Sequence, residues 1–563
     1  MQSVVASLSF VFALCILRPG RNCAIGHFPN ESHQTNSVTA AAASMATEKN
    51  KSEAIPLTGI EDKQPTALIG HSYDDALKEA GFGRAQIWMT LLCGFSVMAS
   101  ANESMGMGII LPASQCDLEL DLSRKGVISG AVFMGIMVST YYWGYQTDVR
   151  GRKAVLKVTL LAAAACSFVA TFVNQFEVLV VLRFIVGLFI SAPASAAIVY
   201  LGEFCPSTKR GQMIGYACAL GGMGFGYVAV FGWWILSYEW TIEVTEFFTI
   251  RPWRMLFLVN TLPGFVSGLV FCLFPETPKF LLSQGKTGEA LKALRWLHRQ
   301  NKGYRERFAV QKLQCDVKRP VAMEAEPEQK SSILRNLWTQ ISPLTKFPHS
   351  LYLVACSIQT ATAYITYGGL GVWFPQIMNI VFKSEVTTGA KICSIIQINP
   401  PVNASSSNIT SPIDVSDCND TLQQEVFIYT LLSGLMCGGY MLLSSIILSK
   451  LTEKTMIYIN MITAGCAGIA LQYITHSYVV AALFCVQIVA AAMCIVLVRS
   501  IQVAAFPTQV RATAISLTNL AGRVGLIISN VVTGLLIVQQ CTFTLYTIAT
   551  LLFVSAGLNA LLP

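Results

Sequence analysis

The chain has 563 residues, of which 53% are hydrophobic and 12% are charged, and its mean hydropathy is +0.54. Soluble domains carry about 25% charged residues, so this composition excludes an ordinary soluble protein and predicts a polytopic protein embedded in membrane lipid. The formal net charge is +8, but the basic residues concentrate in particular loops, so we expect no nucleic-acid partner. The 17 cysteines lie mostly in apolar runs, where they act as small hydrophobic side chains rather than a disulfide scaffold.

Residues 1–86 form a predicted cytoplasmic tail. Residues 3–17 resemble the apolar core of a signal peptide but lack the basic stretch that precedes such a core. Met45 opens a polar segment of ordinary tail composition. We therefore interpret residues 1–44 as a gene-model extension or, alternatively, as a segment that contributes little to function.

Twelve apolar runs follow, each long enough for a membrane-spanning helix, which needs about 20 residues. They lie at 87–112, 127–147, 154–173, 177–201, 212–236, 253–274, 351–381, 425–448, 455–475, 477–500, 512–537 and 541–562. The pattern predicts an all-α membrane protein with two six-helix halves, at 87–274 and 351–563, joined by a cytoplasmic linker at 275–350. A parallel two-half repeat is typical of one large class of transporters.

The charges of the loops predict the orientation of the chain. The short basic loops at Arg150–Lys153 and Lys209–Arg210 fall on one side of the alternating count of spans, which the positive-inside rule assigns to the cytoplasm. The linker 275–350 falls on the same side, and an amphipathic helix is expected near its start, over 286–299. Both termini are then cytoplasmic, and the second long loop, 382–424, lies on the opposite side.

The loop 382–424 predicts glycosylation and a disulfide. Asn-x-Ser/Thr acceptors require a lumenal or extracellular loop, which agrees with the orientation predicted from charge. The acceptors are Asn403, Asn408 and Asn419. Cys393 and Cys418 share this oxidising compartment, so a disulfide between them is expected, with two free thiols as the alternative.

The loop between the second and third spans combines Gly144, Asp148, Gly151, Arg152 and Lys153. A phosphate-binding P-loop is excluded because both its spacing and its strand are missing. Gly144 permits close helix approach, Gly151 suits a sharp turn, and Asp148 can meet a helix N-terminus or a basic partner. A purely basic anchor would leave Asp148 unexplained. The pattern G-x-x-x-D-x-x-G-R-K resembles the signature loop of the major facilitator superfamily, and this likeness implies a conformational latch.

The fourth span carries two further features. Arg183 lies inside it, and a charge within a span is a functional hypothesis by default; an arginine that snorkels to the nearby boundary is the alternative. The span ends in "YLGEFCPSTKRGQ", where Glu203 and Arg210 resemble the E-x-x-P-x-x-x-R-G element of sugar-porter-like members. The resemblance implies that these residues join Asp148 and Arg152 in a cytoplasmic gate that forms when the inner face closes.

The second half repeats this gate poorly. The corresponding loop reads "LSKLTEKT" and offers only Ser449 and Glu453, and the later element retains Arg511 but has Ala504 where a glutamate is expected. Arg499 lies near the cytoplasmic end of the tenth span and could snorkel. We therefore predict a complete latch only in the N-terminal half.

Several stretches, among them "GFGRAQIWMTLLCGF" and "TYGGLGVWFPQIM", resemble the synaptic vesicle glycoprotein family, as does the position of the long loop after span seven. The resemblance covers roughly residues 72–563, with a loop much shorter than the family's. It implies acidic residues in the first span, where Glu103 lies near the middle of the membrane and Ser100 replaces the first acid. Burial disfavours a charged carboxylate, so Glu103 with Arg183 is a candidate pair for proton or cation coupling. A structural hydrogen bond is the alternative.

Polar residues of spans seven and eleven are candidates for the central cavity. Tyr364, Tyr367 and Trp373 are explained equally well as packing or interface residues. Asn519 and Arg523 lie well inside an apolar span, and an anionic substrate group is one partner that Arg523 could have.

No catalytic motif, metal-ligand cluster or cofactor motif appears in the sequence, so we expect a protein that is not an enzyme and holds no metal or cofactor. The leading prediction is a secondary active transporter that moves a small organic solute by alternating access, coupled to a proton or cation. The alternative is a non-transporting relative of the synaptic vesicle glycoproteins that acts through its lumenal loop and cytoplasmic surfaces. In either role, the protein is expected in the plasma membrane or in the membrane of an intracellular, synaptic-type vesicle. The ending "NALLP" leaves no polar tail, which suggests a truncated C-terminus.

Overall fold

The computed structural model describes most of the chain after the tail. The described residues are 72–238, 240–245, 248–303, 306, 308–313, 342–384, 390–398, 420–447 and 450–562. They are nearly all helical, and the strands among them form one short antiparallel hairpin, β1 (Ile242–Thr245) and β2 (Phe248–Ile250). The predicted segment 1–44 and the glycosylation sites Asn403, Asn408 and Asn419 lie outside the described residues.

The N-terminal half contains six helical rods, two of them interrupted near the middle. The rods are α3 (Arg84–Met105) with α4 (Met107–Ala113), α5 (Leu122–Arg150), α6 (Arg152–Ala170), α7 (Phe176–Phe204), α8 (Ser207–Gly222) with α9 (Gly224–Leu236), and α10 (Pro252–Val270). Their ends follow local chemistry. The Asp121 side chain accepts a hydrogen bond from the Arg124 backbone N–H at 2.7 Å and caps α5, and Pro252 occupies the first position of α10.

The C-terminal half repeats this organisation. Its rods are α14 (His349–Tyr364) continued by the π-helical η4 (Ile365–Leu370) and α15 (Gly371–Lys383), then α17 (Gln424–Ile447), α18 (Glu453–Ala470), α19 (Ser477–Ala505), α20 (Thr508–Leu536) and α21 (Cys541–Leu558). A short helix, α16 (Ile392–Ile398), precedes α17. Within the described residues, nine helices are long and apolar enough to cross a membrane. With α3–α4, α14–α15 and α18 they account for the twelve predicted spans.

The duplication is visible in the backbone. Pro206 precedes α8 with φ −55° and ψ 148°, and Pro507 precedes α20 with φ −58° and ψ 149°. The arginine four residues later donates its backbone N–H to the proline carbonyl in both cases, at 2.9 Å for Arg210 and 3.0 Å for Arg511. Equivalent turns at equivalent places confirm two copies of one architecture.

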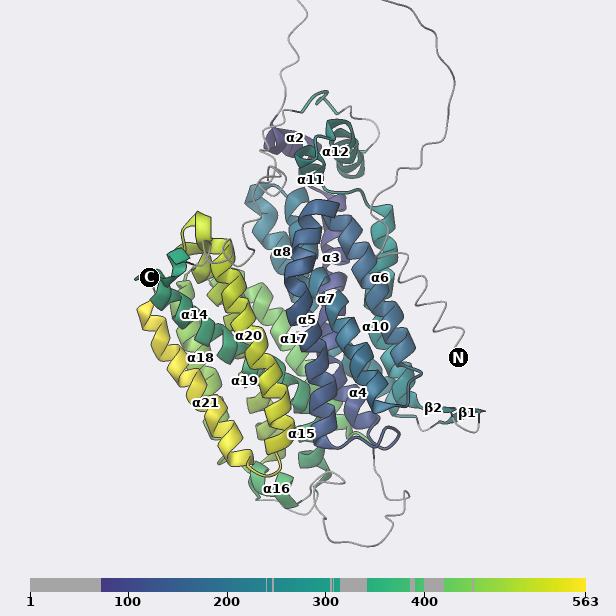
Figure 1. Cartoon of the computed structure of the whole chain (residues 1–563), viewed down its shortest axis with the longest axis vertical. Helices are drawn as coiled ribbons and strands as arrows, with labels where there is room; N and C mark the ends of the chain where they lie inside the picture. The colour runs from purple at the N-terminus through teal and green to yellow at the C-terminus, as the bar shows by residue number, and fades with distance from the viewer. Residues whose placement is uncertain are drawn as a thin grey trace, which may run out of the picture. The chain divides into compact units, whose positions relative to one another are not determined.

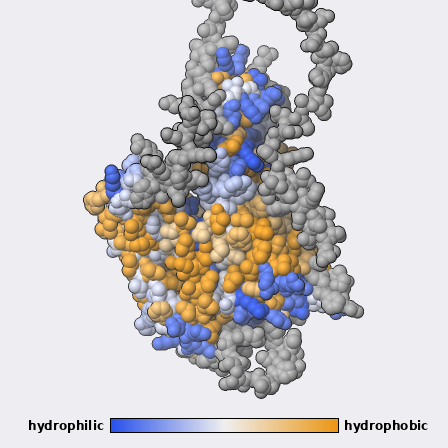
Figure 2. All heavy atoms as spheres, in the orientation of Figure 1, coloured by the Kyte–Doolittle hydropathy of each residue, from blue (hydrophilic) through white to orange (hydrophobic). Residues whose placement is uncertain are grey.

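The two ends of the bundle differ in what covers them. At one end α2 (Tyr73–Ala80), α11 (Pro278–Ser283) and α12 (Thr287–Lys302) gather, and at the other lie the β1–β2 hairpin and α16 (Figure 1). We call these the inner and the outer end, after the predicted orientation. An apolar band crosses the helices between more polar ends (Figure 2). The predicted amphipathic helix is α12, and its Leu294 and Leu297 are fully buried.

The halves meet through small residues. A Cβ added to Gly126 of α5 would lie 3.1 Å from the Asn530 carbonyl oxygen of α20, and one added to Gly434 of α17 would lie 2.4 Å from the Gly226 nitrogen of α9. Glycine is used at such contacts because lipid offers no strong apolar driving force, so helices associate by close backbone packing.

Candidate functional site

A charged pair lies inside the N-terminal half. Arg183 of α7 places Nη1 2.8 Å from Glu103 Oε2 of α3, and the two side chains are 0% and 5% exposed. Nη2 donates to the Glu103 carbonyl oxygen, Ser167 Oγ of α6 donates to Glu103 Oε2 at 2.8 Å, and the guanidinium carbon lies 5.5 Å from the centroid of the Phe257 ring of α10. Arg183 therefore does not snorkel, and four helices of one half enclose the predicted pair.

A small cavity adjoins this pair. Its lining includes Glu103, Ser100, Asn260 and Thr261. Ser100, which replaces the first acid of the family pattern, donates to the Ile190 carbonyl oxygen at 3.0 Å. The rest of the lining is apolar and includes Leu160 and Ile190, so the carboxylate borders a mainly apolar cavity within the N-terminal bundle.

Arg152 connects the acidic groups of the inner latch. Its Nη2 lies 3.1 Å from Asp148 Oδ1 and 3.3 Å from Glu203 Oε1. Asp148 is 68% exposed, whereas Arg152 and Glu203 are 14% and 11% exposed. The pair with Glu203 is therefore the better protected from water, and screening weakens the pair with Asp148.

Gly151 and Glu276 hold the turn between α5 and α6. Gly151 has φ +99°, and a Cβ there would lie 2.5 Å from Glu276 Oε2, so the sequence needs glycine on both counts. Glu276 Oε1 accepts the Lys153 backbone N–H at 3.0 Å, and Oε2 accepts the Ala154 N–H at 3.4 Å. A carboxylate at a helix N-terminus is favoured by the helix dipole. The sequence alone gave no prediction for Glu276.

Two gate residues differ from expectation. Arg210 forms no ion pair with a carboxylate within the described residues; its Nη2 donates to the Cys205 carbonyl oxygen at 3.5 Å and closes its own turn. Gly144 is exposed, and a Cβ there would meet nothing within 4 Å, so no helix approaches it closely. Tyr141, on the same stretch of α5, is 83% exposed. The inner part of α5 is thus not covered by the described part of the other half.

The outer end is closed by an ionic cluster that sequence reasoning missed. Asp117 lies 3.1 Å from Arg254 Nη2 and 3.4 Å from Arg251 Nε, and Arg251 Nη1 reaches Asp420 Oδ2 of the other half at 4.0 Å. Burial raises the pKa of Asp420 above its ordinary value, against the opposing pull of the nearby cations Arg251 and Lys383. No local motif marks this cluster, because its members come from three segments that are far apart in the sequence.

Trp373 packs near the outer end, where it lines a small cavity between the halves together with Lys125 and Gln376. Its Nε1 donates to the Asn530 carbonyl oxygen at 3.2 Å, and its ring lies 3.6 Å from a Cβ added to Gly126. Nearby, Lys125 Nζ donates to Gln376 Oε1 across the halves at 2.8 Å. The indole fits there because the glycine leaves room for it.

The space between the halves carries polar groups further in. Tyr367 lines a cavity with Phe225 and Gly222 of the N-terminal half. Tyr364 Oη accepts a hydrogen bond from Arg499 Nη2 at 3.1 Å, and Asn519 Oδ1 accepts another from the same nitrogen at 3.4 Å. Arg499 is therefore engaged by residues of α14 and α20 and does not simply snorkel.

Arg523 completes this group of side chains. Its guanidinium carbon lies 5.6 Å from the centroid of the Tyr364 ring. The structure therefore brings Arg523 together with the predicted cavity residues Tyr364 and Asn519, and it adds Arg499, which sequence reasoning had set aside.

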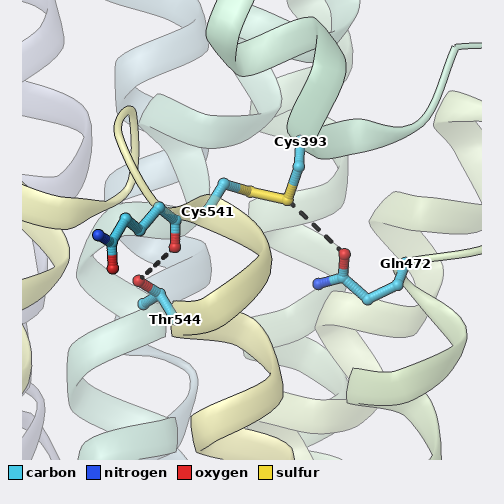
Figure 3. The surroundings of a disulfide bond; sticks show 5 residues. Cys393, Gln472, Cys541 and Thr544 are labelled. Carbon is cyan, nitrogen blue, oxygen red and sulfur yellow. Dashed lines mark hydrogen bonds between the residues drawn. A yellow bond between two sulfur atoms is a disulfide. The ribbon is translucent and has the colours of Figure 1, made fainter.

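The predicted disulfide between Cys393 and Cys418 is wrong. Cys393 of α16 pairs with Cys541 at the start of α21, with a Cα–Cα distance of 5.5 Å (Figure 3), and Cys418 lies outside the described residues. Gln472 Oε1 lies 3.7 Å from Cys393 Sγ. Because α16 packs on α21, a cysteine distant in sequence is the nearer partner. Cys116 is also disulfide-bonded.

Two six-helix halves, one of which encloses a buried ion pair, define a multi-pass membrane protein of the carrier type. The family model described as Major Facilitator Superfamily matches residues 91–530. The chain belongs to the major facilitator superfamily, a family of transporters, and it is not an enzyme.

Within this superfamily, the chain is similar in sequence to known synaptic vesicle glycoproteins. The chain is 27% identical to synaptic vesicle glycoprotein 2B of Mus musculus over 352 residues, 59% of this chain and 50% of that protein. It is 26% identical to synaptic vesicle glycoprotein 2C of Rattus norvegicus over 332 residues, 56% of this chain and 46% of that protein. The chain thus spans about half the length of the curated relatives it matches.

Solved structures share the fold. The inward open conformation of the xylose transporter XylE from E. coli matches with a TM-score of 0.58 at 12% identity, covering 84% of this chain and 95% of that one. A crystal structure of a D-xylose-proton symporter matches with a TM-score of 0.56 at 14% identity, covering 85% and 98%. The predicted fold, twelve helices in two halves, is confirmed.

Proposed function

We propose that the protein is a secondary active transporter that moves a small organic solute by alternating access. The observation that carries the proposal is the asymmetry between the ends of the interface. The outer end is closed by Trp373, by the Lys125–Gln376 hydrogen bond and by the ionic cluster around Asp117, whereas no described residue covers the inner part of α5 around Gly144. A carrier caught facing inward has this arrangement, with both termini in the cytoplasm.

The inner latch fits the same cycle. Glu203 Oε2 is buried and lacks a hydrogen-bond partner within the described residues, and Asp148 is largely exposed. Both carboxylates have unused acceptor capacity in this state. In the proposed cycle they gain partners when the inner end closes, which favours the outward-facing state.

Glu103 and Arg183 are the proposed coupling pair. A proton bound by Glu103 would neutralise the carboxylate and weaken its hold on Arg183, which cannot lose its own proton. Ser167 Oγ, which now donates to Glu103 Oε2, could then accept a hydrogen bond from the protonated carboxyl. The exchange of one proton would thereby shift the packing of α3, α6 and α7. The D-xylose-proton symporter with the same fold supports proton coupling by analogy only.

A non-transporting role is the second candidate, and one observation favours it. Glu453, in the loop that corresponds to the latch of the first half, accepts a hydrogen bond from Ser500 at 3.0 Å and forms no ion pair within the described residues. A half without a charged latch is less suited to the alternation between an inward-facing and an outward-facing state. Such a protein would work in a synaptic-type vesicle or plasma membrane through its outer loop and inner surfaces.

Uptake by the purified protein in proteoliposomes, across a panel of labelled sugars, amino acids and organic acids, decides between the candidates. Transport predicts saturable uptake that responds to a pH gradient and is lost in Glu103→Gln. Glu177→Gln, at an exposed position in the first turn of α7, is the matched control and should retain uptake. If correctly folded protein takes up no solute of the panel, the non-transporting role is favoured.

A further inference from the structure

Two arginines of the C-terminal half converge on one tyrosine. Arg499 of α19 donates to Tyr364 Oη at 3.1 Å, and the Arg523 guanidinium carbon of α20 lies 5.6 Å from the centroid of the same ring. Both guanidinium groups therefore lie beside Tyr364, which makes the two arginines neighbours. Like charges placed together within the hydrophobic part of a membrane protein repel each other and need compensation.

No acidic side chain that the structure describes provides this compensation. In the described ranges, neither Arg499 nor Arg523 forms an ion pair with a carboxylate. This contrasts with Arg183, which is fully buried against Glu103. Arg499 is exposed and Arg523 is partly exposed, so both guanidinium groups reach space that a ligand can occupy. Arginine stays protonated at any accessible pH, so an external anion is the remaining counter-charge.

The tyrosine that both arginines contact lies close in sequence to a cavity between the halves. Tyr367, three residues after Tyr364, lines the cavity that Phe225 of α9 shares with the C-terminal helices. The interface between the halves is where a transporter of this architecture holds its substrate, near the middle of the membrane.

We propose that Arg499 and Arg523 clamp the oxyanion of the substrate, which is a small organic anion bearing a carboxylate or phosphate group. This assignment rests on the proposed transport function and names its substrate class. The planar guanidinium fork matches both oxyanions with paired N–H···O bonds. Tyr364 and Asn519, which now occupy Nη2 of Arg499, hold that fork in place until an anion arrives.

Binding measurements on the full-length protein in detergent test the clamp, with succinate and inorganic phosphate as probes and the uncharged succinamide as the matched neutral compound. We expect succinate or phosphate to bind and succinamide not to bind. Arg499→Gln and Arg523→Gln should each weaken anion binding at least tenfold, and Arg84→Gln, at an exposed position at the start of α3, should leave it unchanged. Equal binding of succinate and succinamide, or full affinity in both arginine variants, overturns the assignment.

A charge reversal tests the clamp without any ligand. Arg499→Glu would place a carboxylate beside Arg523, so the two should pair and raise the unfolding midpoint by several degrees above that of Arg499→Gln. The same substitution should abolish stabilisation by added anions. If Arg499→Glu is no more stable than Arg499→Gln, Arg523 does not lack a counter-charge and the proposal fails.

Uptake assays separate this proposal from the transport function on which it rests. Uptake of neutral solutes only, unchanged by Arg499→Gln, would leave transport standing and overturn the anion assignment. Anion binding that depends on both arginines, without uptake of any solute, would support the site and reject transport.

Discussion

The buried pair of Glu103 and Arg183 predicts unequal effects of its two single substitutions. Removing one partner of a buried ion pair costs about 3–5 kcal/mol, because the other charge loses its compensation. Glu103→Gln leaves a guanidinium that stays charged at any accessible pH. Arg183→Met instead leaves a carboxylate, which can take up a proton and so avoid remaining charged. We therefore expect a large, pH-independent loss of stability for Glu103→Gln and a loss that depends on pH for Arg183→Met.

Arg183→Met leaves the carboxylate of Glu103 without a counter-charge. The cost of this charge cannot exceed the free energy of protonating a glutamate, because the protonated carboxyl group is neutral. With an ordinary carboxyl pKa of about 4.3 and about 1.36 kcal/mol per pH unit, protonation costs ~3.7 kcal/mol at pH 7 and ~1.0 kcal/mol at pH 5. The penalty of this variant should therefore fall by up to about 2.7 kcal/mol between these pH values. For a unit the size of a six-helix half, at about 2–4 °C per kcal/mol, the midpoint should recover by roughly 5–11 °C relative to wild type.

The assay is the thermal unfolding midpoint of the purified protein in detergent at pH 7 and pH 5, each variant compared with wild type at the same pH. Glu177→Gln serves as the surface control and should follow wild type. The double variant Glu103→Gln/Arg183→Met removes both charges, so it should be more stable than Glu103→Gln alone. The reasoning is refuted if both single variants show the same pH dependence, or if the double variant is no more stable than Glu103→Gln.

Three further predictions concern the two ends of the bundle. Gly108→Ala would place a Cβ 2.5 Å from a backbone carbonyl oxygen of α15, so the outer end should open. The labelling of a cysteine introduced at Gln376 by an impermeant thiol reagent should then rise severalfold, and unchanged labelling would contradict the close packing. The pKa of Asp420 is raised in the folded protein, so folding favours proton uptake at this carboxyl group. Asp420→Asn should therefore raise the unfolding midpoint at neutral pH, and this gain should disappear below the ordinary carboxyl pKa. A lowered midpoint would show that the 4.0 Å ion pair with Arg251 outweighs the cost of burial. Asp148→Asn breaks an exposed ion pair worth about 0.3–0.5 kcal/mol, whereas Glu203→Gln breaks a protected one worth about 1.5–3 kcal/mol. Chemical denaturation should therefore show a larger loss in the free energy of unfolding for Glu203→Gln, and the reverse order would refute this account of the latch.

The sequence predicted what depends on neighbours along the chain. Spans follow from the length of apolar runs, because the bilayer thickness fixes how many residues a helix needs. The turn at Gly151 follows from a local pattern, and its positive φ confirms it. The pairing of Glu103 with Arg183 was also predictable, because a charge inside a membrane must find a partner and few candidates exist.

Tertiary structure alone decided which distant residues meet. The disulfide between Cys393 and Cys541 joins residues separated by 148 positions, and the arginines at 499 and 523 meet because α19 and α20 both pack beside α14. The sequence of each helix fixes which face is apolar but not which neighbour covers it, since that depends on how all the helices pack at once. For the same reason, only the structure shows that the outer end is closed while the described part of the other half leaves the inner part of α5 uncovered.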